Sequence, residues 1–131
     1  MTKSGLLLSV ALALTVTAAT GAEENKNTDS ANYMLPICRE LVNGKSGGEQ
    51  GYCAGVVDGI AYMGFLVRTM GKLSPPGETM PRQLCLNVPD EVTIRQMVRV
   101  VIVYIEARPA LMHTSFRGLA LEALRASWPC K

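Results

Sequence analysis

Apolar residues recur at three- and four-residue steps in four stretches of the chain, which is the period of an amphipathic helix. The first stretch begins after Ser30, and Asn43-Gly44 is a good stop because glycine takes the left-handed position that ends many helices. Pro36 is tolerated only in a first turn, so this helix either starts near Tyr33 or kinks. Its apolar face is formed by Met34, Leu35, Cys38, Leu41 and Val42.

The second stretch, after a short connection, predicts a helix over about residues 50–70. Gly51, Gly55 and Gly59 recur every fourth residue beside its apolar face, and each costs a helix about 1 kcal/mol relative to alanine. We expect a neighbouring helix to pack unusually close on this glycine stripe, because small side chains permit it. A phosphate-binding role is disfavoured, since no Gly-Lys-Ser/Thr motif follows. The apolar face contains Cys53, Val56, Val57, Ile60, Gly64 and Val67.

The next segment, residues 71–89, is rich in proline and glycine, so it is neither a regular helix nor a central strand. Because it is long for a connection in a compact domain, it is either a functional loop or a tethered return path. Its structure-breaking residues include Pro75, Pro76, Gly77, Pro81 and Pro89.

A capping box marks the start of the third helix, because the Thr93 hydroxyl and the Gln96 side chain each satisfy an otherwise unpaired amide. Residues 100–103 are β-branched and alone fit a strand, but the capping box and the wider helical period outweigh this. Pro109 ends this helix or opens a fourth, which Pro129 stops. The fourth apolar face comprises Leu111, Met112, Ser115, Phe116, Leu119, Ala120, Ala123 and Leu124. These four stretches predict an all-α fold.

The N-terminus has the composition of a signal peptide. A basic Lys3 precedes an apolar stretch at residues 6–18, and Thr20 and Ala22 place small residues before a cleavage site. A membrane anchor is disfavoured, because this stretch is shorter than the ~20 residues of a span and no later segment is judged long and apolar enough. We therefore predict a signal peptide at residues 1–22 and one exported domain at 23–131.

The charge balance disfavours two classes of partner. The chain has 13 basic and 11 acidic residues, so removal of Lys3 leaves 12 and 11 in the exported part, a net charge of +1. A nucleic-acid binder or an anionic-membrane binder shows a clustered basic face, whereas the arginines here are spread along the chain. We predict no nucleic-acid partner and no membrane partner after signal cleavage.

All four cysteines lie in the exported part, and an even number there is typical of a disulfide framework with three possible connectivities. A metal site is disfavoured, since the chain has no CxxC pair and a single histidine. The link between helices one and two is short, and the segment before Cys85 is long enough (~45 Å) to return to the same end. We favour Cys53 with Cys85 and Cys38 with Cys130, in a small disulfide-stapled bundle of about four helices.

The sequence contains few residues that favour a catalytic role. His113 is the only histidine, and no serine or cysteine motif provides a nucleophile for it, so a surface or interface position is favoured. Asp58 is expected to be half-buried and to pair with an arginine such as Arg95 or Arg99. We predict no catalytic residue and no cofactor, and the chain is not expected to be an enzyme.

Two segments carry a family resemblance. Residues 51–59, GYCAGVVDG, resemble the C-x-G…G helix of the Rap/Tai family of type VI secretion amidase immunity proteins. The later elements VTIRQ, VV, Y, P, H, AL and WPC, which end at Cys130, resemble the second half of the same family's pattern. Val56, Tyr62 and Trp128 depart from that pattern. The resemblance covers roughly residues 33–130 and implies a periplasmic, often dimeric helical protein that binds and blocks a peptidoglycan amidase effector.

Inhibition of this kind requires an element that occludes the amidase cleft, and the proline-rich loop is the candidate, because its prolines reduce the entropy lost on docking. The alternative is that this loop only spans the bundle. Other classes also stay open: a periplasmic acid-stress or holdase-like chaperone, or an envelope-associated structural domain. The candidate partner-binding residues are Ser74, Pro75, Pro76, Gly77, Glu78, Thr79, Met80, Pro81 and Arg82.

Overall fold

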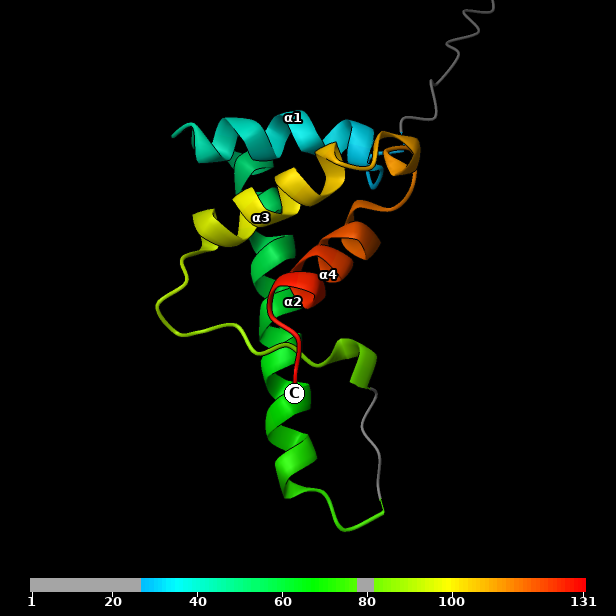
Figure 1. Ribbon diagram of the computed structural model, residues 1–131. Coiled ribbons are helices and arrows are strands. Elements are labelled where there is room, and N and C mark those ends of the chain that lie inside the picture. The colour runs from blue at the N-terminus through cyan, green and yellow to red at the C-terminus, as the bar shows by residue number, and fades with distance from the viewer. Residues whose placement is uncertain (1–26, 78–81) are drawn as a thin grey trace, which may run out of the picture.

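The computed structural model describes residues 27–77 and 82–131, and within these ranges the fold is all-α, as predicted (Figure 1). Two isolated backbone bridges are the only β-type pairings that these residues make. The predicted signal peptide, residues 1–22, lies outside the described residues. The helices are α1 (Ala31–Val42), α2 (Gly48–Leu73), α3 (Ile94–Glu106) and α4 (Phe116–Ser127), with short 3-10 turns at η1 (Arg82–Leu84) and η2 (Pro109–Leu111).

The long helix α2 is the axis of the molecule. Its 26 residues span about 39 Å, and α1, α3 and α4 all pack against its N-terminal part, while its C-terminal end projects beyond them (Figure 1). The buried core lies between these helices and is supplied mainly by aliphatic side chains. Its fully buried members include Met34, Leu35, Val57, Leu86, Val98, Val101, Ile105, Phe116 and Leu124.

Hydroxyl side chains begin three of the helices. The Ser30 side chain accepts from the Tyr33 amide at 3.3 Å, and the Thr93 side chain accepts from the Gln96 amide at 3.2 Å, which confirms the predicted start of the third helix. The fourth helix starts later than predicted, because η2 is a separate turn and Ser115 caps α4. Pro36 lies inside α1, which begins at Ala31 rather than near Tyr33.

The predicted disulfide pairing is wrong. Cys38 is bonded to Cys53 and Cys85 to Cys130, each with Cα atoms 5.7 Å apart. Because α1 packs across the start of α2, Cys38 and Cys53 meet there directly. The loop after α2 returns only part of the way along that helix (Figure 1), and there it meets the C-terminus: Leu86 pairs with Pro129, and the Asn87 amide donates to the Trp128 carbonyl at 3.0 Å. The four sulfurs therefore do not gather at one end.

The glycines of α2 also differ from expectation. A Cβ atom built on Gly51, Gly55 or Gly59 meets nothing within 4 Å, so none of the helices in residues 27–77 and 82–131 packs on the predicted stripe. The close contact is at Gly64, where a Cβ atom would lie 2.5 Å from Leu86 Cβ. In this chain a glycine is thus required where the returning segment crosses α2.

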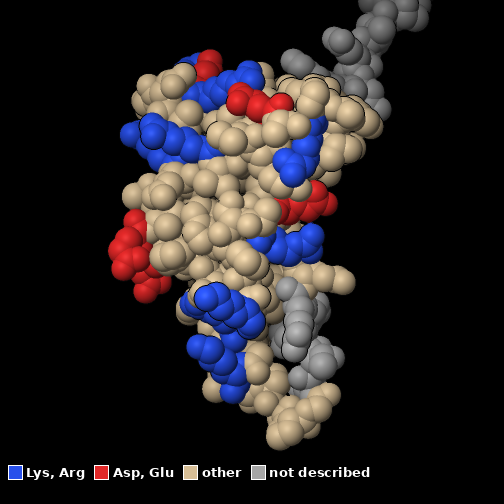
Figure 2. Space-filling model, in the orientation of Figure 1, with Lys and Arg blue, Asp and Glu red and all other residues tan. Residues whose placement is uncertain are grey.

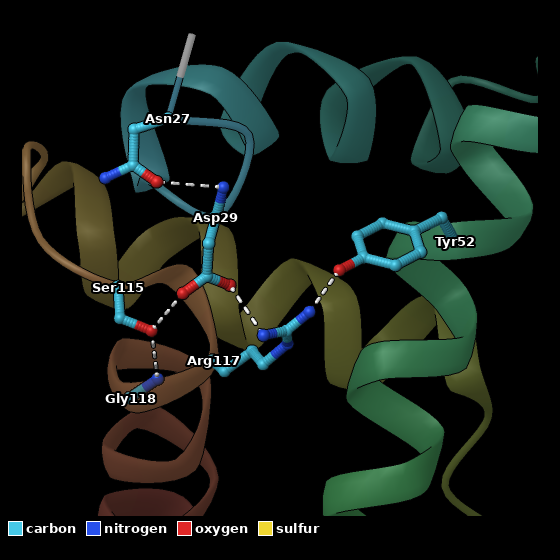
Figure 3. Close-up of polar contacts among 6 residues, drawn as sticks. All are labelled: Asn27, Asp29, Tyr52, Ser115, Arg117 and Gly118. Carbon is cyan, nitrogen blue, oxygen red and sulfur yellow. Dashed lines mark hydrogen bonds and ion pairs between the residues drawn. The ribbon is translucent and has the colours of Figure 1, made fainter. Parts of the chain in front are cut away.

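A polar clasp joins the start of the domain to α2 and α4 (Figure 3). The Asp29 carboxylate accepts from Ser115 Oγ at 2.7 Å and lies 3.4 Å from Arg117 Nη1. Arg117 Nη2 also donates to the Tyr52 hydroxyl at 2.5 Å, so one guanidinium bridges two segments. The Asp29 carbonyl accepts from the Phe116 amide at 2.6 Å. These contacts tie the segment before α1 to the start of α4 and to α2.

Replacing Asp29 with alanine is expected to lower the free energy of unfolding by about 1 kcal/mol, because the lost side-chain contacts are solvent-exposed. Urea denaturation of the variant measures this loss. Asp90→Ala is the control, since this exposed carboxylate makes no hydrogen bond or ion pair within the described part of the chain. Equal stability of the two variants would contradict a clasp that contributes to folding.

Candidate functional site

A projecting feature of the fold is the distal arm, which we define as residues 65–77, the end of α2 and the start of the following loop. It projects away from α1, α3 and α4 (Figure 1). Ser74 ends the helix, where its Oγ donates to the Met70 carbonyl at 2.9 Å. Gly77 then turns the chain with φ of 107°, a left-handed conformation that favours glycine. The arm therefore presents a capped helix end followed by a tight turn.

The predicted partner-binding segment falls at the tip of this arm. Pro75 and Pro76 are exposed there, and Arg82 begins η1 on the return path. The remaining members, Glu78, Thr79, Met80 and Pro81, lie outside the described residues. The segment thus leaves from the far end of α2, at the greatest distance from α1 along that helix.

Both charged side chains of the distal arm are basic. Arg68 and Lys72 lie on it, and residues 65–77 include no acidic side chain. Figure 2 shows this part of the molecule with basic side chains and without acidic ones on the visible face. The Arg68 guanidinium donates to the Asn87 side chain and lies 5.7 Å from the Phe65 ring centroid. The arm thus offers positive charge beside an aromatic surface.

The return path fixes the base of the arm. Leu86 is buried against Gly64, and the adjacent disulfide between Cys85 and Cys130 holds it there. The η1 turn contacts both α2 and α4, and Arg125 Nη1 reaches the Gln83 carbonyl at 3.5 Å. The loop therefore runs between two fixed points. Sequence reasoning placed Gly64 on the apolar face of α2 but missed its contact with Leu86, although an apolar residue directly after a loop cysteine is a usable signal.

The titratable residues singled out in the sequence lie at the surface of the described chain. His113 is exposed, and Asp58 is also exposed rather than half-buried as predicted. The groove on the outer side of α3, about 460 Å³, is lined by no histidine and no carboxylate. Within residues 27–77 and 82–131 no group of three possible metal ligands occurs. The groove lining consists of Gln96, Arg99, Val100, Val103, Tyr104, Ala107, Arg108 and Ser127.

The apolar character of α2 is greater than the sequence reading allowed. Its most apolar 18-residue window has a mean hydropathy of 1.2, so α2 is long and apolar enough to cross a membrane by length and composition alone. The prediction that no later segment reaches this threshold is wrong. One face of α2 packs against the other three helices, and 17% of this apolar window is buried.

Comparison with known proteins gives one match. A family model described as Rap1a immunity proteins matches residues 30–130, from the cap of α1 to the cysteine that closes the C-terminal disulfide. No curated protein and no solved structure matches the chain. The matched range contains all four helices, both disulfides and the distal arm.

Proposed function

Because the chain belongs to the Rap1a immunity protein family, we propose that it is a periplasmic protein that binds and inhibits a peptidoglycan amidase effector of a type VI secretion system. The family match over residues 30–130 carries this proposal. The amidase target is supported by the resemblance of residues 51–59 and of the ending at Cys130 to amidase immunity proteins. The chain itself acts as a binding protein and not as an enzyme.

Export is supported by two independent features. Residues 1–22 have the composition of a cleavable signal peptide, and all four cysteines of the described chain are paired in disulfides, which persist in oxidising compartments such as the periplasm. Peptidoglycan lies in that compartment, so an inhibitor must be there to meet the amidase.

The distal arm is the proposed inhibitory element. It projects from the bundle, its prolines limit the entropy lost on docking, and its base is fixed by the disulfide at Cys85. Arg68 and Lys72 favour a cleft with an acidic rim, since complementary charge guides association. The arm, with residues 74–77 at its tip, would fill the cleft and exclude the peptidoglycan strand.

Co-expression tests the proposal in cells. An amidase encoded beside this gene and directed to the periplasm should lyse the host, and the full chain should protect it. Deletion of residues 1–22 should abolish protection, because the inhibitor then stays in another compartment. Protection without the leader would contradict a periplasmic role, and failure of the full chain to protect against any neighbouring amidase would contradict the immunity function.

Reversing the charge of the arm should weaken inhibition. The Lys72→Glu variant, in which an exposed basic side chain becomes acidic, is expected to raise the dissociation constant for the amidase about tenfold at low salt. Calorimetric titration measures this constant. Arg95→Glu is the matched control, since Arg95 is exposed on α3 away from the arm and should leave the affinity unchanged. An equal effect of both substitutions would argue against the arm.

The family resemblance also supports a homodimer, which we include in the proposal. Among the described residues of one chain, none lies within 4 Å of Cβ atoms built on the glycine stripe of α2. A second copy provides the neighbour that the sequence led us to expect.

A further inference from the structure

The two disulfides differ in their exposure to solvent. Cys38 and Cys53 are both 0% exposed and belong to the core cluster, where α1 crosses α2. Cys85 and Cys130 are each only partly buried, although Leu86 beside them is 1% exposed. A thiolate breaks a disulfide by direct attack on one of its sulfur atoms, so the rate depends on access to that atom. The bond between Cys85 and Cys130 is therefore the more accessible of the two.

The surroundings of the partly exposed disulfide are positively charged. Residues 83–87 and 125–131 include Arg125 and Lys131, both exposed, and no acidic side chain. Arg125 Nη1 lies 3.5 Å from the Gln83 carbonyl, which places its guanidinium beside the returning segment. Positive charge nearby stabilises a cysteine thiolate, and a more stable thiolate leaves a disulfide faster. The charge of this region thus favours exchange at the bond that is also the more accessible.

This disulfide joins the return path of the loop to the end of the chain. Among the described residues, the backbone contacts between these two segments are the bridge of Leu86 to Pro129 and the hydrogen bond from the Asn87 amide to the Trp128 carbonyl (Figure 1). Residues 128–131 lie beyond the last turn of α4. Chain ends fray unless they are tied down. Loss of the sulfur bond would therefore let the two segments separate.

We propose that the disulfide between Cys85 and Cys130 is a reversible latch, which a dithiol reductant opens to release the base of the distal arm. One thiolate of the dithiol bonds to a sulfur of the pair, and the other cysteine leaves as a thiolate. The second thiol of the reductant then attacks the mixed disulfide. The protein gains two electrons and two protons as two thiols, and the dithiol becomes a disulfide. The buried bond between Cys38 and Cys53 stays intact and holds α1 on α2.

The latch rests on the proposed function, because it makes inhibition depend on the state of one bond. In the oxidised protein the loop after Ser74 runs between two fixed points, the end of α2 and the return path at Cys85. Once the return path is released, this loop must be ordered again when the amidase binds. The entropy lost in that step lowers the affinity. Inhibition is thus lost in the presence of a dithiol and restored by oxidation.

The order of reduction is measured on the oxidised protein without amidase. Dithiothreitol is added under native conditions, free thiols are trapped with iodoacetamide, and the tryptic peptides are identified by mass spectrometry. Peptides 83–95 and 126–131 should be alkylated at least about tenfold faster than peptides 27–39 and 46–68, because the latter contain the buried bond and must wait for the bundle to open. Equal rates, or earlier alkylation of 27–39, would overturn the latch.

A double variant, Cys85→Ser with Cys130→Ser, represents the open latch. Circular dichroism should show the helix content of the wild type. Amides of residues 83–88 should exchange with deuterium at least about tenfold faster than in the wild type, whereas the amide of Val57, in the buried part of α2, should stay protected. Loss of helix content, or unchanged exchange at residues 83–88, would contradict a latch that opens locally.

An affinity measurement links the latch to inhibition. The wild type, reduced with dithiothreitol, alkylated and freed of reductant, should bind the amidase with a dissociation constant at least about tenfold above that of the oxidised protein. The double variant should match the reduced form, and dithiothreitol should leave its affinity unchanged. Equal affinity of oxidised and open forms would overturn the latch and leave the inhibition standing. An oxidised protein that binds no amidase would contradict the proposed function, while the order of reduction would still decide the latch.

Discussion

Removal of the disulfide between Cys85 and Cys130 is expected to destabilise the protein by about 4 kcal/mol, and removal of the one between Cys38 and Cys53 by about 3 kcal/mol. These figures follow from the loops that the bonds close, 45 and 15 residues long, in the chain-entropy model. Domains of this size are stable by only about 5–15 kcal/mol. The fully reduced chain should therefore lose most of its stability, which a thermal melt with and without reductant measures.

Peptide mapping under non-reducing conditions separates this pairing from its alternatives. Trypsin places the four cysteines in four different peptides, residues 27–39, 46–68, 83–95 and 126–131. The first should be linked to the second, and the third to the fourth. A link between 46–68 and 83–95 would contradict the structure, and a melting temperature that reductant leaves unchanged would contradict the stabilising role.

Gly64→Ala should be the most damaging of the glycine substitutions in α2. Its new Cβ would lie 2.5 Å from both Cβ and Cγ of Leu86, so the returning segment must shift, at a cost of about 2–3 kcal/mol. Gly55→Ala is the matched control in the same helix. There the site is open, and the substitution should stabilise the helix by up to about 1 kcal/mol.

Urea denaturation at low protein concentration compares the two variants without the contribution of self-association. Opposite signs are expected for the two changes in unfolding free energy. Adding Leu86→Ala to Gly64→Ala should cost less than the sum of the two single changes, because the clash is then absent. A neutral Gly64→Ala would show that Leu86 does not pack against α2 as described.

The helices could be predicted because their determinants are local. The Thr93 hydroxyl and the apolar period around it set the start of α3, and Pro129 follows the end of α4. The start of α4 was misplaced because Pro109 opens a separate turn and Ser115, within the apolar period, is the cap. Several possible start or stop residues can occur within a few positions of one another, so the boundary of a helix is harder to predict than its presence.

The disulfide pairing could not be predicted because it depends on how far the loop returns along α2. Loop length gives only the maximum reach, whereas the packing of Leu86 against Gly64 determines where the return stops. The glycine stripe illustrates the same limit. Sequence spacing indicated a close neighbour for Gly55, but no described residue lies within 4 Å of a Cβ atom built there.

The sequence predicted part of the candidate site. Proline content identified the loop that begins at Ser74, and the structure adds that the end of α2 carries this loop away from the bundle. The basic character of the arm comes from Arg68 and Lys72, which lie in the helix and were not singled out in the sequence. Their common location became evident only once α2 was seen to extend past the other helices.

The most direct test of the central claim is a titration of amidase activity with the purified, disulfide-bonded protein. The amidase encoded beside the gene is held at a fixed concentration, and the release of cleaved peptidoglycan is measured as the protein is added. Cleavage should fall in proportion to the added protein and reach background at about one chain per amidase, as expected for tight binding. Full cleavage in the presence of a molar excess of the folded protein would contradict the account.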